Sequence, residues 1–191
     1  MAHLPNFLSL FRILLVPVLV TVLFTKFEGR EYVGLVVFLL ASLTDFLDGF
    51  VARRQNHVTR LGKLLDPAAD KILTSAAFIS LVELGLAPAW MVAAIVAREF
   101  AVSTLRSVLA SEDVIVGATM AGKVKTTLQI IAISVLIIKH QLGDFSQLAP
   151  VLLWLALIAS VYSGVEYFVR YMPHLVSLWH SDNKMSEDGD G

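Results

Sequence analysis

Six long apolar runs constrain the fold of this chain more than any other feature of its sequence. A helix rises about 1.5 Å per residue, so roughly 20 apolar residues cross a bilayer core about 30 Å thick. The runs lack the alternating pattern of barrel strands and therefore predict helices. The expected spans are 8–24, 32–52, 66–85, 88–109, 124–138 and 148–171. We predict an all-α, polytopic membrane protein with six transmembrane helices.

Composition agrees with this class. The chain has 191 residues, of which 57% are hydrophobic and 16% charged, whereas an ordinary soluble domain carries about 25% charged residues. There is no cysteine, so disulfides, thiolate metal sites and cysteine nucleophiles are excluded. We expect one membrane domain over residues 1–180. Residues 181–191 form a polar, acidic tail that is expected to be disordered.

The distribution of Lys and Arg predicts the orientation of the spans. One side would hold the N-terminus, the 53–65 and 106–125 loops and the C-terminal tail. By the positive-inside rule, the richer side faces the cytoplasm, so the protein is expected in the inner (cytoplasmic) membrane with both termini inside. The richer side would carry Arg12, Arg53, Arg54, Arg60, Lys63, Arg106, Lys123, Lys125, Arg170 and Lys184, against Lys26, Arg30 and Lys139 on the other.

Four aspartates lie at the cytoplasmic ends of the second and third spans. Asp45 and Asp48 share one face of the second span, and Asp66 and Asp70, four residues apart, share one face of the third. A lone charge near mid-membrane costs roughly 2.5–3.5 kcal/mol on insertion scales, so the cluster requires positive charge. Hard divalent cations prefer oxygen ligands. The four carboxylates therefore predict a site for Mg²⁺, or for Mn²⁺ in its place.

Two other interpretations of these carboxylates remain open. Asp66 precedes Pro67, and an Asp-Pro pair is a common helix start in which Asp is the N-cap. An acidic cluster can also be the transport site of a divalent-cation carrier. A carrier predicts acidic residues along a path through the membrane, whereas these four gather near one end.

The spacing of the aspartates resembles the signature of the CDP-alcohol phosphotransferases. Residues 45–70 follow the pattern DxxDGxxARx8GxxxDxxxD without departure. The resemblance implies six membrane helices, a homodimer and a cytidine diphosphate donor that binds at the cytoplasmic side. The matching positions are Asp45, Asp48, Gly49, Ala52, Arg53, Gly62, Asp66 and Asp70.

Each position of this motif also has a physical reason. Gly49 and Ala52 leave one helix face without bulk, so a flat nucleotide can approach the backbone. Arg53 carries a permanent charge that suits a phosphate, although the same side chain could instead extend to anionic lipid headgroups. Gly62 would let the loop turn sharply before the third span. With Asp45, the residues Gly49, Ala52 and Arg53 are implied to bind the CDP group.

The resemblance implies substitution at phosphorus as the reaction. An alcohol attacks the phosphorus that bears the lipid, and CMP leaves. Asp45, Asp48, Asp66 and Asp70 are implied as metal ligands, with Asp70 also acting as the general base. Two metal ions can stabilise charge on the entering and leaving oxygens.

A second group of charges predicts the attacking alcohol. Arg98 and Arg106 lie eight residues apart on nearly one helix face, and Lys123 and Lys125 begin the fifth span. These four cations suit a phosphorylated acceptor. Arg98 could instead pair with Glu99 or Glu166, and the two lysines could be inside-positive anchors.

The flanking stretches resemble, more loosely, the branch of the family that makes phosphatidylglycerophosphate. The implied reaction transfers the phosphatidyl group of CDP-diacylglycerol to sn-glycerol 3-phosphate in phospholipid biosynthesis. Branches that make cardiolipin, phosphatidylserine or phosphatidylinositol phosphate are the alternatives. The expected partners are the two substrates, membrane lipids and a second copy of the chain, without nucleic acid.

Overall fold

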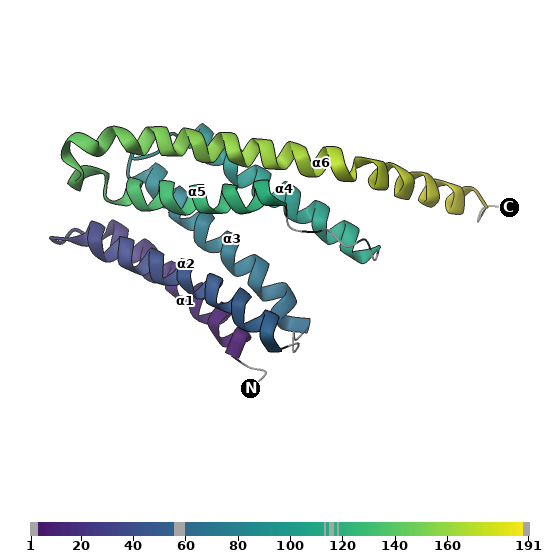
Figure 1. The fold of residues 1–191 in the computed structure, drawn as a ribbon, viewed down its shortest axis with the longest axis horizontal. Helices are drawn as coiled ribbons and strands as arrows, with labels where there is room; N and C mark the ends of the chain where they lie inside the picture. Colours follow the sequence, from purple (N-terminus) through teal and green to yellow (C-terminus); the bar gives the residue numbers. More distant parts are fainter. Residues whose placement is uncertain (1–3, 56–59, 113, 115–116, 118, 189–191) are drawn as a thin grey trace.

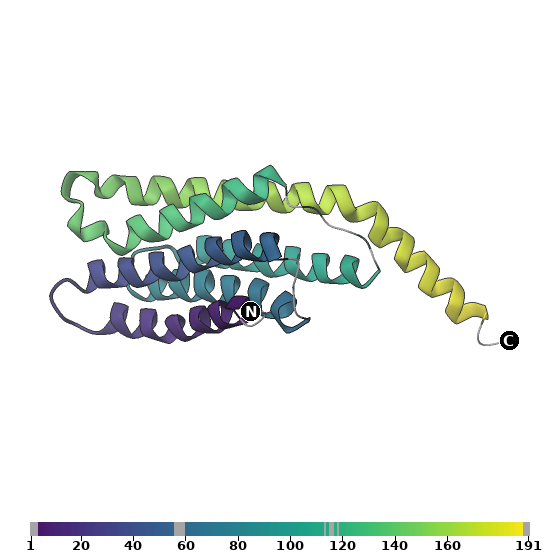
Figure 2. The same cartoon turned by 60° about the horizontal axis from the view of Figure 1, so that its bottom comes forward.

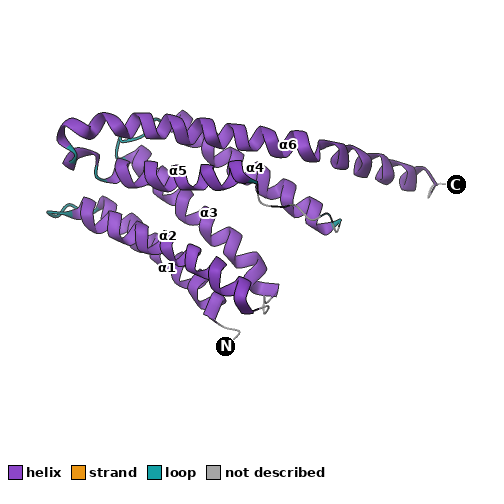
Figure 3. Ribbon diagram, in the orientation of Figure 1, coloured by secondary structure: helices purple, strands orange, loops and turns teal. Residues whose placement is uncertain are grey.

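The described chain is built from helices joined by short connections. The computed structural model describes the backbone of residues 4–55, 60–112, 114, 117 and 119–188, and the side chains of residues 10–44, 68–112, 114, 117 and 119–173. These residues contain no strand, which confirms the predicted all-α class (Figure 3). The α-helices are α1 (Leu4–Phe24), α2 (Arg30–Gln55), α3 (Arg60–Glu83), α4 (Ala89–Ser111), α5 (Met120–Ile137) and α6 (Leu148–Asp188), with 3₁₀ turns at Lys139–Gln141 and Gly143–Gln147 before α6.

The helices pack side by side in two groups. α1 packs against both α2 and α3, whereas α6 packs against α4 and α5. Figure 1 shows α1 and α2 below and the long α6 above, and in the turned view of Figure 2 α1 and α2 again lie apart from α6. α3 contacts α4 and α5 as well as α1, so it joins the groups. A continuous apolar core runs between them, with Phe38, Phe78, Leu81 and Ile133 almost completely buried.

Local sequence signals explain where several helices end and begin. Gly85 adopts φ +70 after α3, and the Leu86 amide donates to the Leu81 carbonyl at 2.8 Å, as in a glycine-terminated helix end. Thr119 caps α5, because its Oγ1 accepts from the Gly122 amide at 3.1 Å. These signals place the start of α5 at Met120, four positions before the predicted Val124.

The start of α3 differs from the sequence-based prediction. α3 begins at Arg60, so Asp66 lies inside a helix and is not an N-cap. Gly62 also lies inside α3 rather than in a turning loop. Arg, Leu and Lys in this stretch are good helix formers, and they extend the helix beyond the apolar run.

α6 also continues further than its apolar run. The helix reaches Asp188, whereas the sequence predicted a disordered tail from residue 181. Residues 189–191 lie outside the described part of the chain. Lys184, Met185 and Glu187 have good helix propensity, which favours continuation of the helix.

Two helical segments of the described chain are long and apolar enough to cross a membrane. They are Met120–Ile137 and Gly143–Pro173, and Leu10–Phe24 is a shorter apolar helix. Large apolar side chains are exposed along several helices, including Ile79 at 58% and Ile158 at 59%. Extensive exposed apolar surface is typical of a protein that contacts lipid. Charged residues within α3 and α4 lower the hydropathy of those helices.

Candidate functional site

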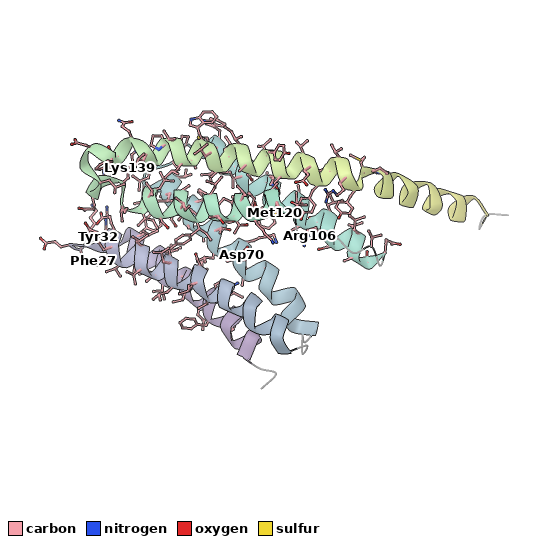
Figure 4. All side chains as sticks on the ribbon, in the orientation of Figure 1. Phe27, Tyr32, Asp70, Arg106, Met120 and Lys139 are labelled. Carbon is pink, nitrogen blue, oxygen red and sulfur yellow. The ribbon has the colours of Figure 1, made fainter. Side chains whose placement is uncertain are left out.

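A charged cavity lies between α3, α4, α5 and α6. Its volume is about 640 Å³, and Ser42 of α2 also reaches it. Figure 4 shows Asp70 and Arg106 well away from the end of the molecule that carries Phe27, Tyr32 and Lys139. The described residues that line the charged cavity are Ser42, Asp70, Lys71, Arg98, Glu99, Val102, Ser103, Arg106, Thr119, Gly122, Lys123, Lys125, Thr126, Thr127, Ile130 and Tyr167.

Positive charge predominates in this lining. Among the described residues, five Lys and Arg side chains face two carboxylates, those of Asp70 and Glu99. The structure thus brings Asp70 to the same cavity as all four cations that the sequence predicted for the acceptor. Arg106 and Lys123 are exposed, so water-soluble anions can reach them. An excess of positive charge in a cleft attracts such anions.

Glu99 is the centre of an ion-pair network in this cavity. Its Oε1 accepts from Arg98 Nη1 at 2.9 Å and from Lys125 Nζ at 2.6 Å. Gln129 Nε2 donates to the same oxygen at 3.2 Å. Of the two partners proposed for Arg98 from the sequence, Glu99 is therefore the one observed. Lys125 is only 7% exposed and is paired, so it is not a surface anchor.

Tyr167 is the described residue of α6 that lines the cavity. The Tyr167 hydroxyl donates to the Gly117 carbonyl at 3.0 Å, which ties the α4–α5 connection to α6. The Arg106 guanidinium lies over the Tyr167 ring, 5.9 Å from its centroid. A cation over an aromatic face is attracted to it. The Arg106 side chain is therefore held at the cavity although it is exposed.

Most of the aspartate motif lies outside the described side chains. Asp45 and Asp48 belong to α2, and Asp66 and Asp70 belong to α3, two helices that contact each other. Only the Asp70 side chain is described, and it is partly buried at the cavity. The side chains of the predicted CDP-binding residues, Gly49, Ala52 and Arg53 with Asp45, lie outside the description too.

The donor set nevertheless fits a hard divalent cation. All four predicted ligands are carboxylates, whose oxygens suit Mg²⁺ and Mn²⁺. Asp66 and Asp70 lie one turn apart within continuous helix, as a shared face requires. Among the side chains that the structure describes, no group of three His, Asp or Glu residues gathers at one point. The aspartate cluster itself therefore remains a prediction.

Sequence reasoning missed several residues of the cavity and of the hydrogen-bond network beside it. Lys71 lies next to Asp70 and faces the same space, but it was not among the cations predicted for the acceptor. Ser163 accepts from Arg98 Nη2 at 2.9 Å, and Gln129 and Tyr167 take part as described above. A polar residue inside an apolar run, such as Gln129 or Ser163, is the signal that could have identified them.

The fold and the site define a helical protein of membrane type with a cation-lined cavity beside an aspartate-bearing helix pair. The chain belongs to the CDP-alcohol phosphatidyltransferase family, whose family model matches residues 2–162. This match confirms the family predicted from the aspartate motif.

Curated relatives cover most of the chain. It is 46% identical over 185 residues to the CDP-diacylglycerol–glycerol-3-phosphate 3-phosphatidyltransferase of Bacillus subtilis, covering 89% of this chain and 95% of that protein. A protein of the same name from Rickettsia typhi is 37% identical over 171 residues, covering 88% of this chain and 96% of its own length. The namesake from Salmonella choleraesuis is 35% identical over 172 residues, with 86% and 92% covered.

Proposed function

We propose that this protein transfers the phosphatidyl group of CDP-diacylglycerol to sn-glycerol 3-phosphate, releasing CMP and giving phosphatidylglycerophosphate. The observation that carries the proposal is the charged cavity, which brings Asp70 together with Arg98, Arg106 and Lys123. An anionic acceptor is the substrate that such a cavity favours. Relatives with 35–46% identity over nearly their whole length carry the name of this activity.

The residues of this chain divide the work between acceptor and donor. Arg106 and Lys123 are the exposed cations of the charged cavity, so they bind the phosphate of glycerol 3-phosphate, with Arg98 beside them. Asp70 takes the proton from the attacking hydroxyl as the new oxygen–phosphorus bond forms. The bond from that phosphorus to the CMP oxygen breaks, and CMP carries away the electron pair.

The aspartate motif is proposed to hold the donor. Asp45, Asp48, Asp66 and Asp70 would ligate Mg²⁺ or Mn²⁺, which supplies stabilisation of negative charge on the diphosphate oxygens. Gly49 and Ala52 leave room for the cytidine, and Arg53 pairs with the diphosphate. Asp70 belongs to the aspartate motif and also lines the charged cavity, so we propose that it is a group that both substrates share.

Placement in the membrane follows from the same charges. We propose that all six α-helices span the inner membrane, with the charged cavity open to the cytoplasm and two copies forming a homodimer. The connections 25–29, 84–88 and 138–147 meet at the end opposite the cavity, since Arg30, Leu84 and His140 line one small pocket there. That end carries few Lys and Arg residues, as the positive-inside rule requires of an external face.

The proposal is tested with purified protein, CDP-diacylglycerol and a panel of alcohol acceptors. We expect glycerol 3-phosphate to release CMP fastest and to give phosphatidylglycerophosphate as the lipid product. Phosphatidylglycerol, serine and inositol phosphate should be poor acceptors. Asp70→Asn is the control that should abolish turnover. Preference for any other acceptor would refute the assignment to glycerol 3-phosphate.

A further inference from the structure

Three donors from two helices converge on a single oxygen of Glu99. Arg98 Nη1, Lys125 Nζ and Gln129 Nε2 lie 2.9, 2.6 and 3.2 Å from Oε1. The Glu99 side chain is only 11% exposed, and that of Lys125 only 9%. Hydrogen bonds to a charged group in such shielded surroundings are the stronger kind, so the network holds α4 and α5 in a fixed relation.

Arg98 has a second anchor on α6. Its Nη2 donates to Ser163 Oγ at 2.9 Å, while Nη1 is held by Glu99. Gly164 leaves the space that the arginine occupies, because a Cβ there would lie 2.9 Å from Arg98 Cγ. The guanidinium is therefore held by one partner on α4 and one on α6, and these two contacts set its direction at the cavity.

The two lysines of this region differ in what they can contact. Lys123 is exposed at the charged cavity, whereas Lys125 is 7% exposed and already donates to Glu99. A bound phosphate would have to compete with a carboxylate at 2.6 Å for the Lys125 ammonium. Removing the Glu99 charge would leave Arg98 and Lys125, two cations that now share one oxygen, to repel each other.

We propose that Glu99 is a positioning residue of the acceptor site, and that Lys125 acts on the acceptor through Glu99 rather than by contacting its phosphate. This inference rests on the proposed function. Glu99 neutralises Lys125, and together they fix the Arg98 guanidinium for the acceptor. The phosphate is then left to Arg98, Arg106 and Lys123.

A double-mutant cycle tests whether Lys125 acts through Glu99. The variants are Glu99→Gln, Lys125→Met and the double variant, each assayed for the KM of glycerol 3-phosphate and of CDP-diacylglycerol. We expect each single variant to raise the acceptor KM roughly 10-fold or more, with the donor KM within about threefold. The double variant should be no worse than the poorer single variant within about threefold, since residues that act as one unit are not additive.

If the rise in acceptor KM of the double variant is the product of the two single rises, the proposal is overturned, because Lys125 would then contact the acceptor independently of Glu99. An equal rise in both KM values would overturn it too, since general loss of structure would have that effect. Ser163→Ala gives a second test should Glu99→Gln fail to accumulate. It should raise the acceptor KM several-fold, and an unchanged value would refute the role of the network.

The parent protein separates this inference from the proposed function. A parent that does not use glycerol 3-phosphate overturns both. If the parent is active but the rises in acceptor KM multiply in the double variant, only the role of Glu99 is overturned. Binding gives an independent readout: glycerol 3-phosphate should raise the melting temperature of the parent, and by less in Glu99→Gln and in the double variant alike.

Discussion

Lys125 Nζ lies 2.6 Å from Glu99 Oε1, and the two residues belong to different helices, α5 and α4. Lys123, two positions earlier on α5, is exposed at the same cavity. Lys125 and Lys123 thus have different roles although they are neighbours on one helix. One is used in holding helices together, and the other is available to an anion from solution.

Lys123→Ala should therefore weaken use of the acceptor and spare the donor. A lost charge-assisted contact of about 1.5–3 kcal/mol corresponds to a fall of roughly 10-fold to 150-fold in kcat/KM for glycerol 3-phosphate. The KM of CDP-diacylglycerol should stay within a few-fold. Lys26 is an exposed lysine in the connection between α1 and α2, so Lys26→Ala is the matched control and should behave as the parent. Equal losses for donor and acceptor would contradict the assignment.

Removal of divalent cations should stop turnover. Because the proposed ligands are four carboxylates, they would repel an anionic diphosphate unless a metal ion lay between them. CMP release should disappear in chelator and return with Mg²⁺ or Mn²⁺, whereas chelator already saturated with Mg²⁺ should have no effect. Undiminished activity after thorough metal removal would rule out the metal site.

The aspartate ligands can be tested one at a time. Asp66→Asn keeps the side-chain volume and removes the charge, so the rate at saturating Mg²⁺ should fall at least 100-fold, on the order of the several kcal/mol that a metal contributes. Asp144→Asn is the control, since Asp144 is exposed in the 3₁₀ turn before α6. A near-normal rate for Asp66→Asn would show that Asp66 is not a ligand.

The existence of the helices could be predicted from sequence, because each apolar run is too long for a strand and long enough for a membrane helix. Their ends could not, since Arg60 and Lys63 interrupt the apolar pattern while still favouring helix. The cations of the site could be predicted as a group from their positions near helix ends. Glu99 could be proposed as a partner of Arg98 because it is the next residue. The contact of Arg98 with Ser163 could not be predicted, because the two residues are 65 positions apart and only the packing of α4 on α6 brings them together.

The orientation of the protein can be tested with single cysteines, since the chain has none of its own. Glu28 is exposed in the connection between α1 and α2, and Ser111 is exposed at the opposite end, where α4 finishes. In intact cells a membrane-impermeant thiol reagent should label Glu28→Cys. Ser111→Cys should be labelled only after the membrane is permeabilised. The reverse pattern would contradict a cytoplasmic site.

The surface of α6 offers a test of the membrane environment itself. Ile158 lies near the middle of the apolar segment Gly143–Pro173 and is 59% exposed. If lipid surrounds this position, Ile158→Arg should cost about 2.5–3.5 kcal/mol on insertion, because a charge at the centre of a membrane helix loses its water. In water, an exposed substitution would change stability by only about 0.5 kcal/mol.

We therefore expect Ile158→Arg to reduce the amount of chain recovered in the membrane fraction, whereas Ile158→Ala should accumulate as the parent does. Leu157→Ala provides a contrast at the next position. Leu157 is 6% exposed and packs in the core, so its truncation should lower the melting temperature in detergent without a comparable loss of insertion. Equal recovery of Ile158→Arg and Ile158→Ala would mean that this face of α6 does not meet lipid, and the six-span arrangement would have to be abandoned.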